Sequence, residues 1–178
     1  MKHFTSLSEV TQADRGASAA IGNFDGVHLG HQAVLDIARK AAREKDGKLA
    51  VLTFEPHPRE VFHPEIQPFR LMTPKARAHR LEKIGVDLLF ELPFTPALYE
   101  LEHEEFCSQI LSQGLGLSHV TVGGDFRYGK GRKGDIDTLR AAGEREGFGV
   151  TIADLIGTGA HSKSISSTAI REALSEGR

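Results

Sequence analysis

A short apolar segment, a glycine-rich turn and an amphipathic helix follow one another early in the chain, and they constrain its fold most. Residues 18–24 are apolar enough for a buried strand. The helix expected after Gly30 gathers small and apolar side chains on one face: Val34, Leu35, Ala38, Ala41 and Ala42. A second apolar run covers residues 48–54. Strand, helix and strand with short connections predict a parallel βαβ unit.

The same alternation continues to the end of the chain. Further helices are expected over 74–84, 103–113, 136–145 and 168–175, and further strands over 87–92, 118–122 and 149–156. Residues 1–16 are polar and weakly patterned, with room for a short surface helix. Five strand signals alternating with helices predict an α/β fold, a Rossmann-like, doubly wound parallel sheet in which residues 1–178 form a single domain.

Composition narrows the classes of function. The net charge of −2 argues against a nucleic-acid partner, which calls for a basic face. No apolar run approaches the ~18 residues of a membrane helix, and residues 1–20 lack the apolar core of a signal peptide. The lone Cys107 suits a reducing compartment and is interpreted as core packing. We therefore expect a cytoplasmic protein without a membrane partner.

Three irregular loops follow strands, at 22–31, 55–73 and 123–135. Four of the seven prolines lie in the second loop, so neither a helix nor a central strand can run through it. Ligands of doubly wound sheets bind beyond the carboxyl ends of strands, near the reversal of strand order. We expect the three loops and the serine-rich stretch before the last helix to converge there.

The first of these loops carries His28 and His31, three positions apart where the helix begins. Free N–H groups and the positive end of a helix dipole suit a phosphate, and both imidazoles can face it. Phosphate contact is the preferred interpretation. A metal site is the rival, and it would need His57 or Asp25 as a further ligand.

The other two loops leave alternatives open. The loop at 123–135 is either a solvated basic surface or a grip for a phosphate or flavin phosphate, with function favoured for Asp125 and Phe126. The aromatic residues of the proline-rich region either cover the end of the sheet or form a wall for a planar ligand; these are Phe54, Phe62 and Phe69.

The last helix begins with more hydroxyl groups than a cap requires. Ser166 or Ser167 can cap it, and the extra hydroxyls with Arg171 suit a second phosphate contact. The chain has neither a Gly-x-Ser-x-Gly elbow nor a Gly-x-x-x-x-Gly-Lys-Ser/Thr loop. Such a set of residues favours direct phosphoryl or nucleotidyl transfer, in which positioning and electrostatics supply the rate.

Four motifs together resemble one known family. His28-Leu29-Gly30-His31 resembles the HxGH signature of nucleotidyltransferases, and Ile165-Ser166-Ser167-Thr168-Ala169-Ile170-Arg171 resembles their closing element. Thr53-Phe54-Glu55-Pro56-His57-Pro58 and Gly124-Asp125-Phe126-Arg127-Tyr128-Gly129, with Arg132-Lys133-Gly134-Asp135, look like the adenylyltransferase module of bacterial bifunctional riboflavin kinase/FAD synthetases. The resemblance implies an FMN adenylyltransferase that makes FAD and pyrophosphate from FMN and ATP with Mg²⁺.

The resemblance also implies roles for particular residues. His28 and His31 would contact the ATP phosphates and stabilise the transition state, and Ser167, Thr168 and Arg171 would hold the β- and γ-phosphates from the other side. The adenylate pocket would be shaped by Gly22, Asn23, Phe24, Asp25 and Gly30. The residues facing the flavin or the metal would be His57, Pro58, Phe62, Asp125, Phe126 and Arg127. The resemblance implies no certain protein ligand for the metal, because Mg²⁺ would arrive on the ATP phosphates.

The family normally continues into a β-barrel riboflavin kinase domain, which these 178 residues do not contain. The sequence is then either part of a longer protein or a module that stands alone, and no kinase activity is expected of it. Two other functions remain as alternatives: an HxGH nucleotidyltransferase with a different phosphorylated acceptor, and a non-catalytic module that binds nucleotide or flavin.

Overall fold

A computed structural model describes residues 1–66, 69–153 and 166–177. Within these ranges six parallel strands form one sheet, in the order β1-β4-β3-β2-β5-β6. The strands are β1 (Lys2–Phe4), β2 (Ser18–Ile21), β3 (Leu49–Glu55), β4 (Leu88–Pro93), β5 (His119–Gly123) and β6 (Gly149–Ala153). The α/β, doubly wound parallel architecture expected from the sequence is confirmed.

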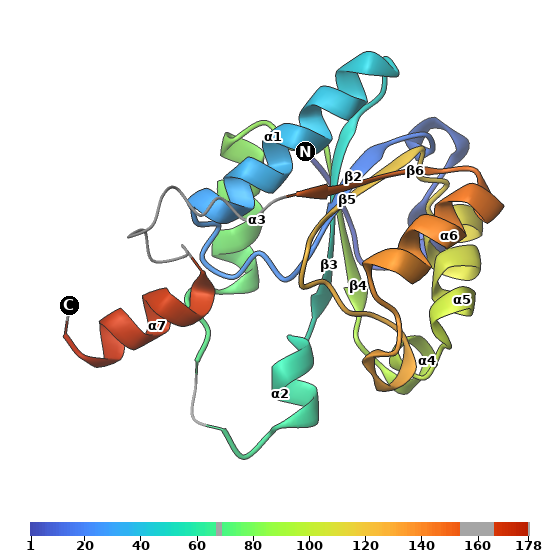
Figure 1. Ribbon diagram of the computed structural model, residues 1–178. Coiled ribbons are helices and arrows are strands. Elements are labelled where there is room, and N and C mark those ends of the chain that lie inside the picture. The colour runs from blue at the N-terminus through green and yellow to red at the C-terminus, as the bar shows by residue number, and fades with distance from the viewer. Residues whose placement is uncertain (67–68, 154–165, 178) are drawn as a thin grey trace.

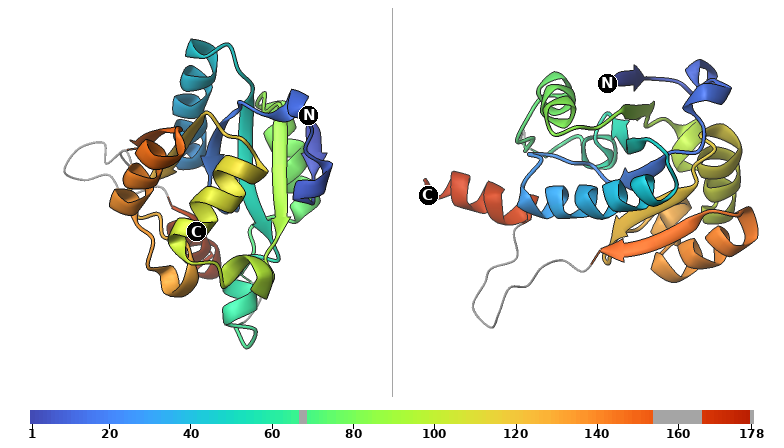
Figure 2. Two further views of the ribbon diagram at one scale, coloured as in Figure 1. Left: turned by 90° about the vertical axis from the view of Figure 1, so that its right-hand side faces the viewer. Right: turned by 90° about the horizontal axis from the view of Figure 1, so that it is seen from above.

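Helices cover both faces of this sheet, as Figure 1 and Figure 2 show. The α-helices are α1 (Leu29–Glu44), α2 (Pro58–Phe62), α3 (Pro74–Lys83), α4 (Pro96–Tyr99), α5 (His103–Glu105), α6 (Ile136–Glu146) and α7 (Ser167–Ser175). A π-helix covers Phe106–Gly114, and single 3₁₀ turns cover Leu7–Glu9, Gln12–Asp14 and Lys130–Arg132.

Two apolar cores lie on opposite faces of the sheet. Along β3, Leu49 and Val51 point to one core, and Leu52 and Phe54 point to the other. The alternation follows from the two-residue period of a strand. The first core receives the inner face of α1, where the five residues expected to be buried are buried: Val34, Leu35, Ala38, Ala41 and Ala42. The second core receives the π-helix and α6.

The strand order reverses at β2, which pairs with β3 on one side and with β5 on the other. Ser18 lies opposite Leu49 in one neighbour and opposite His119 in the other. The chain therefore leaves β2 at the point where a doubly wound sheet opens a crevice for a ligand. The glycine and histidine turn of residues 22–28 follows that strand directly.

Several boundaries differ from the sequence expectation. The sheet has a sixth strand, β1, within residues interpreted as irregular; only Phe4 of its three residues is buried, so the pattern is too short to detect. The first predicted strand ends at Ile21 rather than at residue 24, because Phe24 takes a left-handed conformation with φ of 51°. Residues 154–156 of the last predicted strand lie outside the described residues.

Two helical predictions also needed correction. The expected helix over 103–113 is a short α5 followed by the π-helix, whose buried residues include Cys107, as its interpretation as core packing requires. The proline-rich loop contains a short helix, α2, which begins at Pro58, where proline costs no hydrogen bond. No residue of α7 is buried, and Leu174 is 62% exposed.

Within the described ranges, no helix combines the length and the apolar character needed to cross a membrane.

Candidate active site

The turn between β2 and α1 takes an unusual backbone path. Phe24 and Val27 both have positive φ, and both side chains are nevertheless buried. Gly26 has φ of 92°, and a Cβ at this position would lie 2.9 Å from Leu71 Cδ1. Glycine suits both the positive φ and the close approach of the Leu71 side chain.

His28 is the N-cap of α1. Its Nδ1 accepts a hydrogen bond from the His31 backbone N–H at 3.3 Å. Because Nδ1 acts as an acceptor, the proton of the neutral ring sits on Nε2. Burial lowers the pKa of His28 below its ordinary value, so the ring is neutral at pH 7. His28 therefore presents one N–H donor at a helix N-terminus.

His31 stacks on His28 and is more deeply buried. The two ring centroids are 3.6 Å apart, and the ring of Phe24 lies 5.0 Å from His31 on centroids. Burial, followed by the proximity of His28, lowers the pKa of His31 to about 3. Its Nδ1 is buried and has no hydrogen-bond partner within the described part of the chain. The histidine pair is thus neutral and stacked at the start of α1.

Asp25 joins the turn to two distant segments. Its side chain is 1% exposed, and its carboxylate accepts hydrogen bonds from the backbone N–H groups of Leu71 and Met72. Arg171 Nη2 donates to Asp25 Oδ2 at 2.6 Å. Burial alone would raise the pKa of Asp25, but these hydrogen bonds outweigh it and hold the pKa below its ordinary value. Asp25 is therefore an ionised, fully engaged anchor.

The start of α7 lies against this turn. Ser166 is the N-cap, and its Oγ accepts from the Ala169 N–H at 3.1 Å. Ser167 Oγ donates to the backbone oxygen of Asp25 at 2.9 Å, whereas Thr168 is exposed. Arg171 also donates from Nε to Phe69 O at 2.8 Å. Of the serine-rich motif, Ile165 lies outside the described residues.

In the proline-rich loop, the rings of His57 and Phe69 pack together near Arg171, the partner of Asp25. His57 meets the ring of Phe69 edge-on at 5.0 Å between centroids, and it caps α2 by accepting from the Arg59 N–H. The guanidinium groups of Arg59 and Arg171 lie 4.8 and 5.0 Å from the Phe69 ring centroid. Burial lowers the pKa of His57 to about 4. Phe69 therefore packs against Arg171 of α7, whereas Phe54 lies in the second core. The two aromatic side chains have different surroundings.

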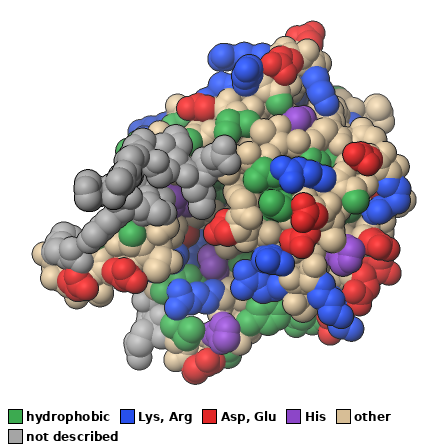
Figure 3. All heavy atoms as spheres, viewed as in Figure 1, with side chains coloured by type: hydrophobic (Ala, Val, Ile, Leu, Met, Phe, Trp, Pro, Cys, Tyr) green, Lys and Arg blue, Asp and Glu red, His purple; other side chains and the backbone are tan. Residues whose placement is uncertain are grey.

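Phe62 and Pro58 lie on α2 at the same edge of the sheet. Phe62 is 53% exposed, and its ring packs edge-on against Phe94 and Tyr99. Figure 3 shows histidine side chains beside Lys and Arg side chains on the lower half of the molecule, in the region of α2. A shallow hollow beside α2 is lined by Glu60, His63, Pro64, Ile66, Phe69 and Arg70.

The glycine-rich loop at 123–135 follows β5 but turns toward other elements. Asp125 and Arg127 are exposed, and Arg127 pairs with Asp135 at 3.9 Å. Phe126 stacks on Tyr128 at 5.4 Å, and both pack against the core under the π-helix. Within the described residues, no contact joins Asp125, Phe126 or Arg127 to His28, His31 or Asp25. Direct contacts therefore confirm the expected convergence for residues 22–31, the proline-rich loop and α7. For the loop at 123–135 it stays a prediction.

A metal site at His28 and His31 would need at least one further ligand, and the described residues do not supply it. Across residues 1–66, 69–153 and 166–177, no three His, Cys, Asp or Glu side chains are grouped so that they could hold a metal ion. Asp25, the suggested third ligand, is occupied by Arg171 and two backbone N–H groups.

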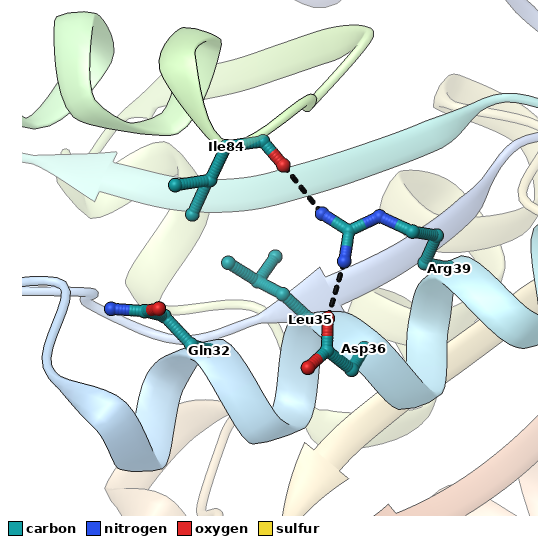
Figure 4. A pocket seen from close by; sticks show the side chains of 5 residues that line it. All are labelled: Gln32, Leu35, Asp36, Arg39 and Ile84. Atoms are coloured by element: carbon teal, nitrogen blue, oxygen red, sulfur yellow. Dashed lines mark hydrogen bonds and ion pairs between the residues drawn. The ribbon is translucent and has the colours of Figure 1, made fainter.

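A second hollow lies away from this region, between α1 and the end of α3. Figure 4 shows that Arg39 crosses it, with hydrogen bonds to Asp36 and to Ile84 O. Gln32 and Leu35 complete its lining. Arg39 is already engaged by acceptors of the protein itself, and none of the expected site residues lines this hollow.

Sequence reasoning missed the contacts of Asp25 and a buried arginine, Arg77. It treated Asp25 as part of a pocket, whereas the structure makes it the link between three segments. Arg77 is fully buried and bonds to Asn23 O at 2.9 Å, although it lies on a charged helix. The sequence offered one indication of this buried arginine, a charged residue at a helix position that faces the sheet. That indication is weak, because the sequence alone does not show which face of the helix is buried.

Stacked histidines lie at the switch point of the parallel sheet, and Ser167 and Arg171 are bound to Asp25 in the same turn, as expected of a Rossmann-like domain of the HxGH nucleotidyltransferase type. Comparison with known protein families gives the assignment within this class. Residues 10–169 match the family described as FAD synthetase. The chain belongs to the FAD synthetase family.

Curated relatives agree with this assignment. The chain is 42% identical over 168 residues to a bifunctional riboflavin kinase/FMN adenylyltransferase of Pseudomonas fluorescens, covering 94% of this chain and 53% of the relative. It is 36% identical over 177 residues to the protein of the same name from Escherichia coli K12, covering 99% of this chain and 56% of the relative. The chain therefore spans about half the length of the curated relatives it matches.

A solved structure shares the fold. A crystal structure described as a macrolide-efflux protein from Streptococcus pneumoniae superposes with a TM-score of 0.81 at 25% sequence identity. The match covers 97% of this chain and 56% of that chain.

Proposed function

We propose that this chain is an FMN adenylyltransferase, which transfers AMP from ATP to the phosphate of FMN and gives FAD and pyrophosphate. The observation that carries the proposal is the placement of His28, His31 and Arg171 around the N-terminus of α1 at the switch point of the sheet. Membership of the FAD synthetase family and the names of the curated relatives support the choice of FMN as acceptor.

In this reaction an oxygen of the FMN phosphate forms a bond to the α-phosphorus of ATP. The bond from that phosphorus to the bridging oxygen breaks, and pyrophosphate leaves with the electron pair. Negative charge spreads over the phosphoryl oxygens in the transition state, and fixed hydrogen-bond donors stabilise it. The Nε2–H of His28 is such a donor, because its Nδ1 is already engaged at the helix cap. His31 takes the same role from the neighbouring ring.

Arg171, Ser167 and Thr168 would hold the β- and γ-phosphates from the opposite side. Arg171 Nη2 and Nε are engaged by Asp25 and Phe69 O, which orients the guanidinium and leaves Nη1 without a partner in the described residues. A guanidinium fixed in this way matches phosphate oxygens with little loss of entropy. Ser167 and the exposed Thr168 are adjacent residues at the N-terminus of α7, where free backbone N–H groups also favour a phosphate.

The remaining expected site residues divide between the two substrates. Gly22, Asn23, Phe24, Asp25 and Gly30 would shape the adenylate pocket along the turn. The flavin would lie at the edge of the sheet that carries α2 and the glycine-rich loop, in contact with His57, Pro58, Phe62, Asp125, Phe126 and Arg127. The exposed ring of Phe62 supports this assignment, because a planar apolar ligand can cover it.

Mg²⁺ would accompany ATP. Magnesium usually keeps several waters and binds through one or two carboxylates and the substrate phosphates, so a dedicated cage of protein ligands is not needed. The described residues fit such a metal, since they offer donors for phosphate rather than a closed ligand set. When bound, Mg²⁺ would neutralise charge on the phosphates.

The proposal treats residues 1–178 as one nucleotidyltransferase domain that acts in the cytoplasm on small molecules. The longer relatives support a riboflavin kinase domain as its partner in a complete protein.

The test is incubation of the chain with FMN and MgATP, with FAD and pyrophosphate followed by chromatography. FAD formed in equal amount to pyrophosphate is expected. Consumption of ATP only with another phosphorylated acceptor would favour a different HxGH nucleotidyltransferase. Tight binding of FMN or ATP without any product would favour a non-catalytic binding module.

A further inference from the structure

We propose that Arg77 is a positioning residue for ATP, which it serves by fixing the peptide between Asn23 and Phe24. The inference rests on the proposed function and assigns a task to a residue that does not touch substrate. Arg77 lies in the first turns of α3, and its side chain reaches the carboxyl edge of the sheet, where it is fully buried.

Three acceptors surround the Arg77 guanidinium. Nη1 donates to the backbone oxygen of Asn23 at 2.9 Å, and Nη2 donates to Glu55 Oε1 at 2.7 Å and to Glu91 Oε2 at 3.0 Å. Glu55 is the last residue of β3 and Glu91 lies in β4. A single planar group therefore ties the turn after β2 to two neighbouring strands.

The charge balance explains why an arginine can be buried here. An isolated guanidinium without counter-ions would be costly to bury, and the two carboxylates supply them. Glu55 is shared with Arg70, which donates to it at 2.8 and 3.1 Å, and Glu91 faces His3 Nε2 at 3.4 Å. The network thus extends from β1 to the proline-rich loop.

The contact with Asn23 controls the next peptide group. A trans peptide is planar, so its C=O and N–H point in opposite directions. With Asn23 O held by Arg77, and approached by Thr53 Oγ1 at 3.4 Å, the N–H of Phe24 must point away from the network. Within the described residues, this N–H has no hydrogen-bond acceptor. Arg77 thereby presents a free backbone donor in the turn that also carries His28.

A lysine cannot replace this arrangement. Its ammonium is a point charge on a flexible stem, whereas Arg77 uses two separate nitrogens to reach Asn23 O and the two carboxylates. Lysine can retain the charge balance with Glu55 and Glu91 and still release the peptide. Arg77→Lys should therefore leave the fold intact while it removes the hydrogen bond that fixes the Asn23–Phe24 peptide.

The experiment compares Arg77→Lys and Arg77→Met with Arg80→Met, a matched variant of an exposed arginine on the same helix. Calorimetry measures the dissociation constants of MgATP and FMN, and amide hydrogen exchange measures the protection of residues 22–28. For Arg77→Lys we expect the dissociation constant of ATP to rise about tenfold, which corresponds to the loss of about one charge-assisted hydrogen bond. The dissociation constant of FMN should stay within twofold of the wild-type value. Exchange in the turn should accelerate. Arg80→Met should match the wild type in every measurement.

If Arg77→Met fails to fold, Arg77→Lys decides the question alone. Unchanged ATP affinity in a folded Arg77→Lys variant overturns the inference, as does an equal loss of ATP and FMN affinity. These outcomes are distinct from failure of the proposed function. If ATP affinity depends on Arg77 but the chain makes no FAD, the inference stands and the proposed function is rejected. If the chain makes FAD but ATP affinity does not depend on Arg77, the function stands and the inference is rejected.

Discussion

Arg171 Nη2 lies 2.6 Å from Asp25 Oδ2, across a sequence separation of 146 residues. The pair attaches the closing helix to the turn that carries His28 and His31, and Ser167 adds a hydrogen bond to the backbone of Asp25. The same carboxylate holds the backbone at residues 71 and 72. One buried side chain thus assembles three segments that are remote in sequence.

We expect Asp25→Asn to loosen α7. An amide keeps an acceptor for the backbone N–H groups but loses the charge that holds Arg171, so unfolding should become easier by about 2 kcal/mol. Limited proteolysis near residues 166–177 should accelerate, and thermal denaturation should report the lost stability. Asp137→Asn is the matched control, because Asp137 is an exposed residue with a weak ion pair to Arg140. Equal protection of α7 in both variants would contradict the anchoring role.

His28→Ala and His31→Ala should lower kcat for FAD formation far more than the affinity for FMN. Each removes a fixed donor to the phosphates, a loss of the order of 10²–10³ in rate. Steady-state kinetics and FMN binding by fluorescence separate the two effects. His79→Ala, an exposed histidine of α3, serves as the control. Retained turnover with lost FMN binding would move the histidines from the phosphates to the flavin site.

The buried histidines predict a loss of stability on mild acidification. The pKa of His31 is lowered from 6.5 to about 3 and that of His57 to about 4, so the unfolded chain takes up protons first as the pH falls below about 6.5. The free energy of unfolding should therefore decrease between pH 6.5 and pH 4, by up to about 1.4 kcal/mol per pH unit for each histidine.

Urea unfolding at pH 7.5, 6 and 5 measures this effect. His31→Gln should reduce the slope of stability against pH, because the variant has no imidazole to protonate in the unfolded chain. A slope identical to that of the wild type would show that His31 titrates equally in both states.

Cys107 should resist thiol reagents in the folded protein. Its side chain is fully buried beside the Tyr128 hydroxyl at 3.5 Å, and burial raises the pKa of the thiol. A colorimetric thiol assay at pH 7.5 should detect the single cysteine only after urea is added. Rapid labelling of the native protein would place Cys107 in a region that opens locally.

Local sequence patterns determined much of this protein. The apolar face of α1, the buried runs of β3 and β4 and the glycine-rich turn each reflect interactions between residues close in sequence, so their periodicity could be interpreted directly. The N-cap at Ser166 follows the same rule. The family motifs indicated which residues to examine at the edge of the sheet.

Tertiary structure alone decided how those residues meet. The partners of Asp25 lie at residues 71, 72 and 171, and those of Arg77 lie on a turn and two strands, so no periodic pattern could connect them. Phe24 leaves the strand although it is apolar, because the turn needs a left-handed residue there and the core still buries its ring. Long-range electrostatic pairing and backbone path, rather than hydrophobic periodicity, shaped the candidate site.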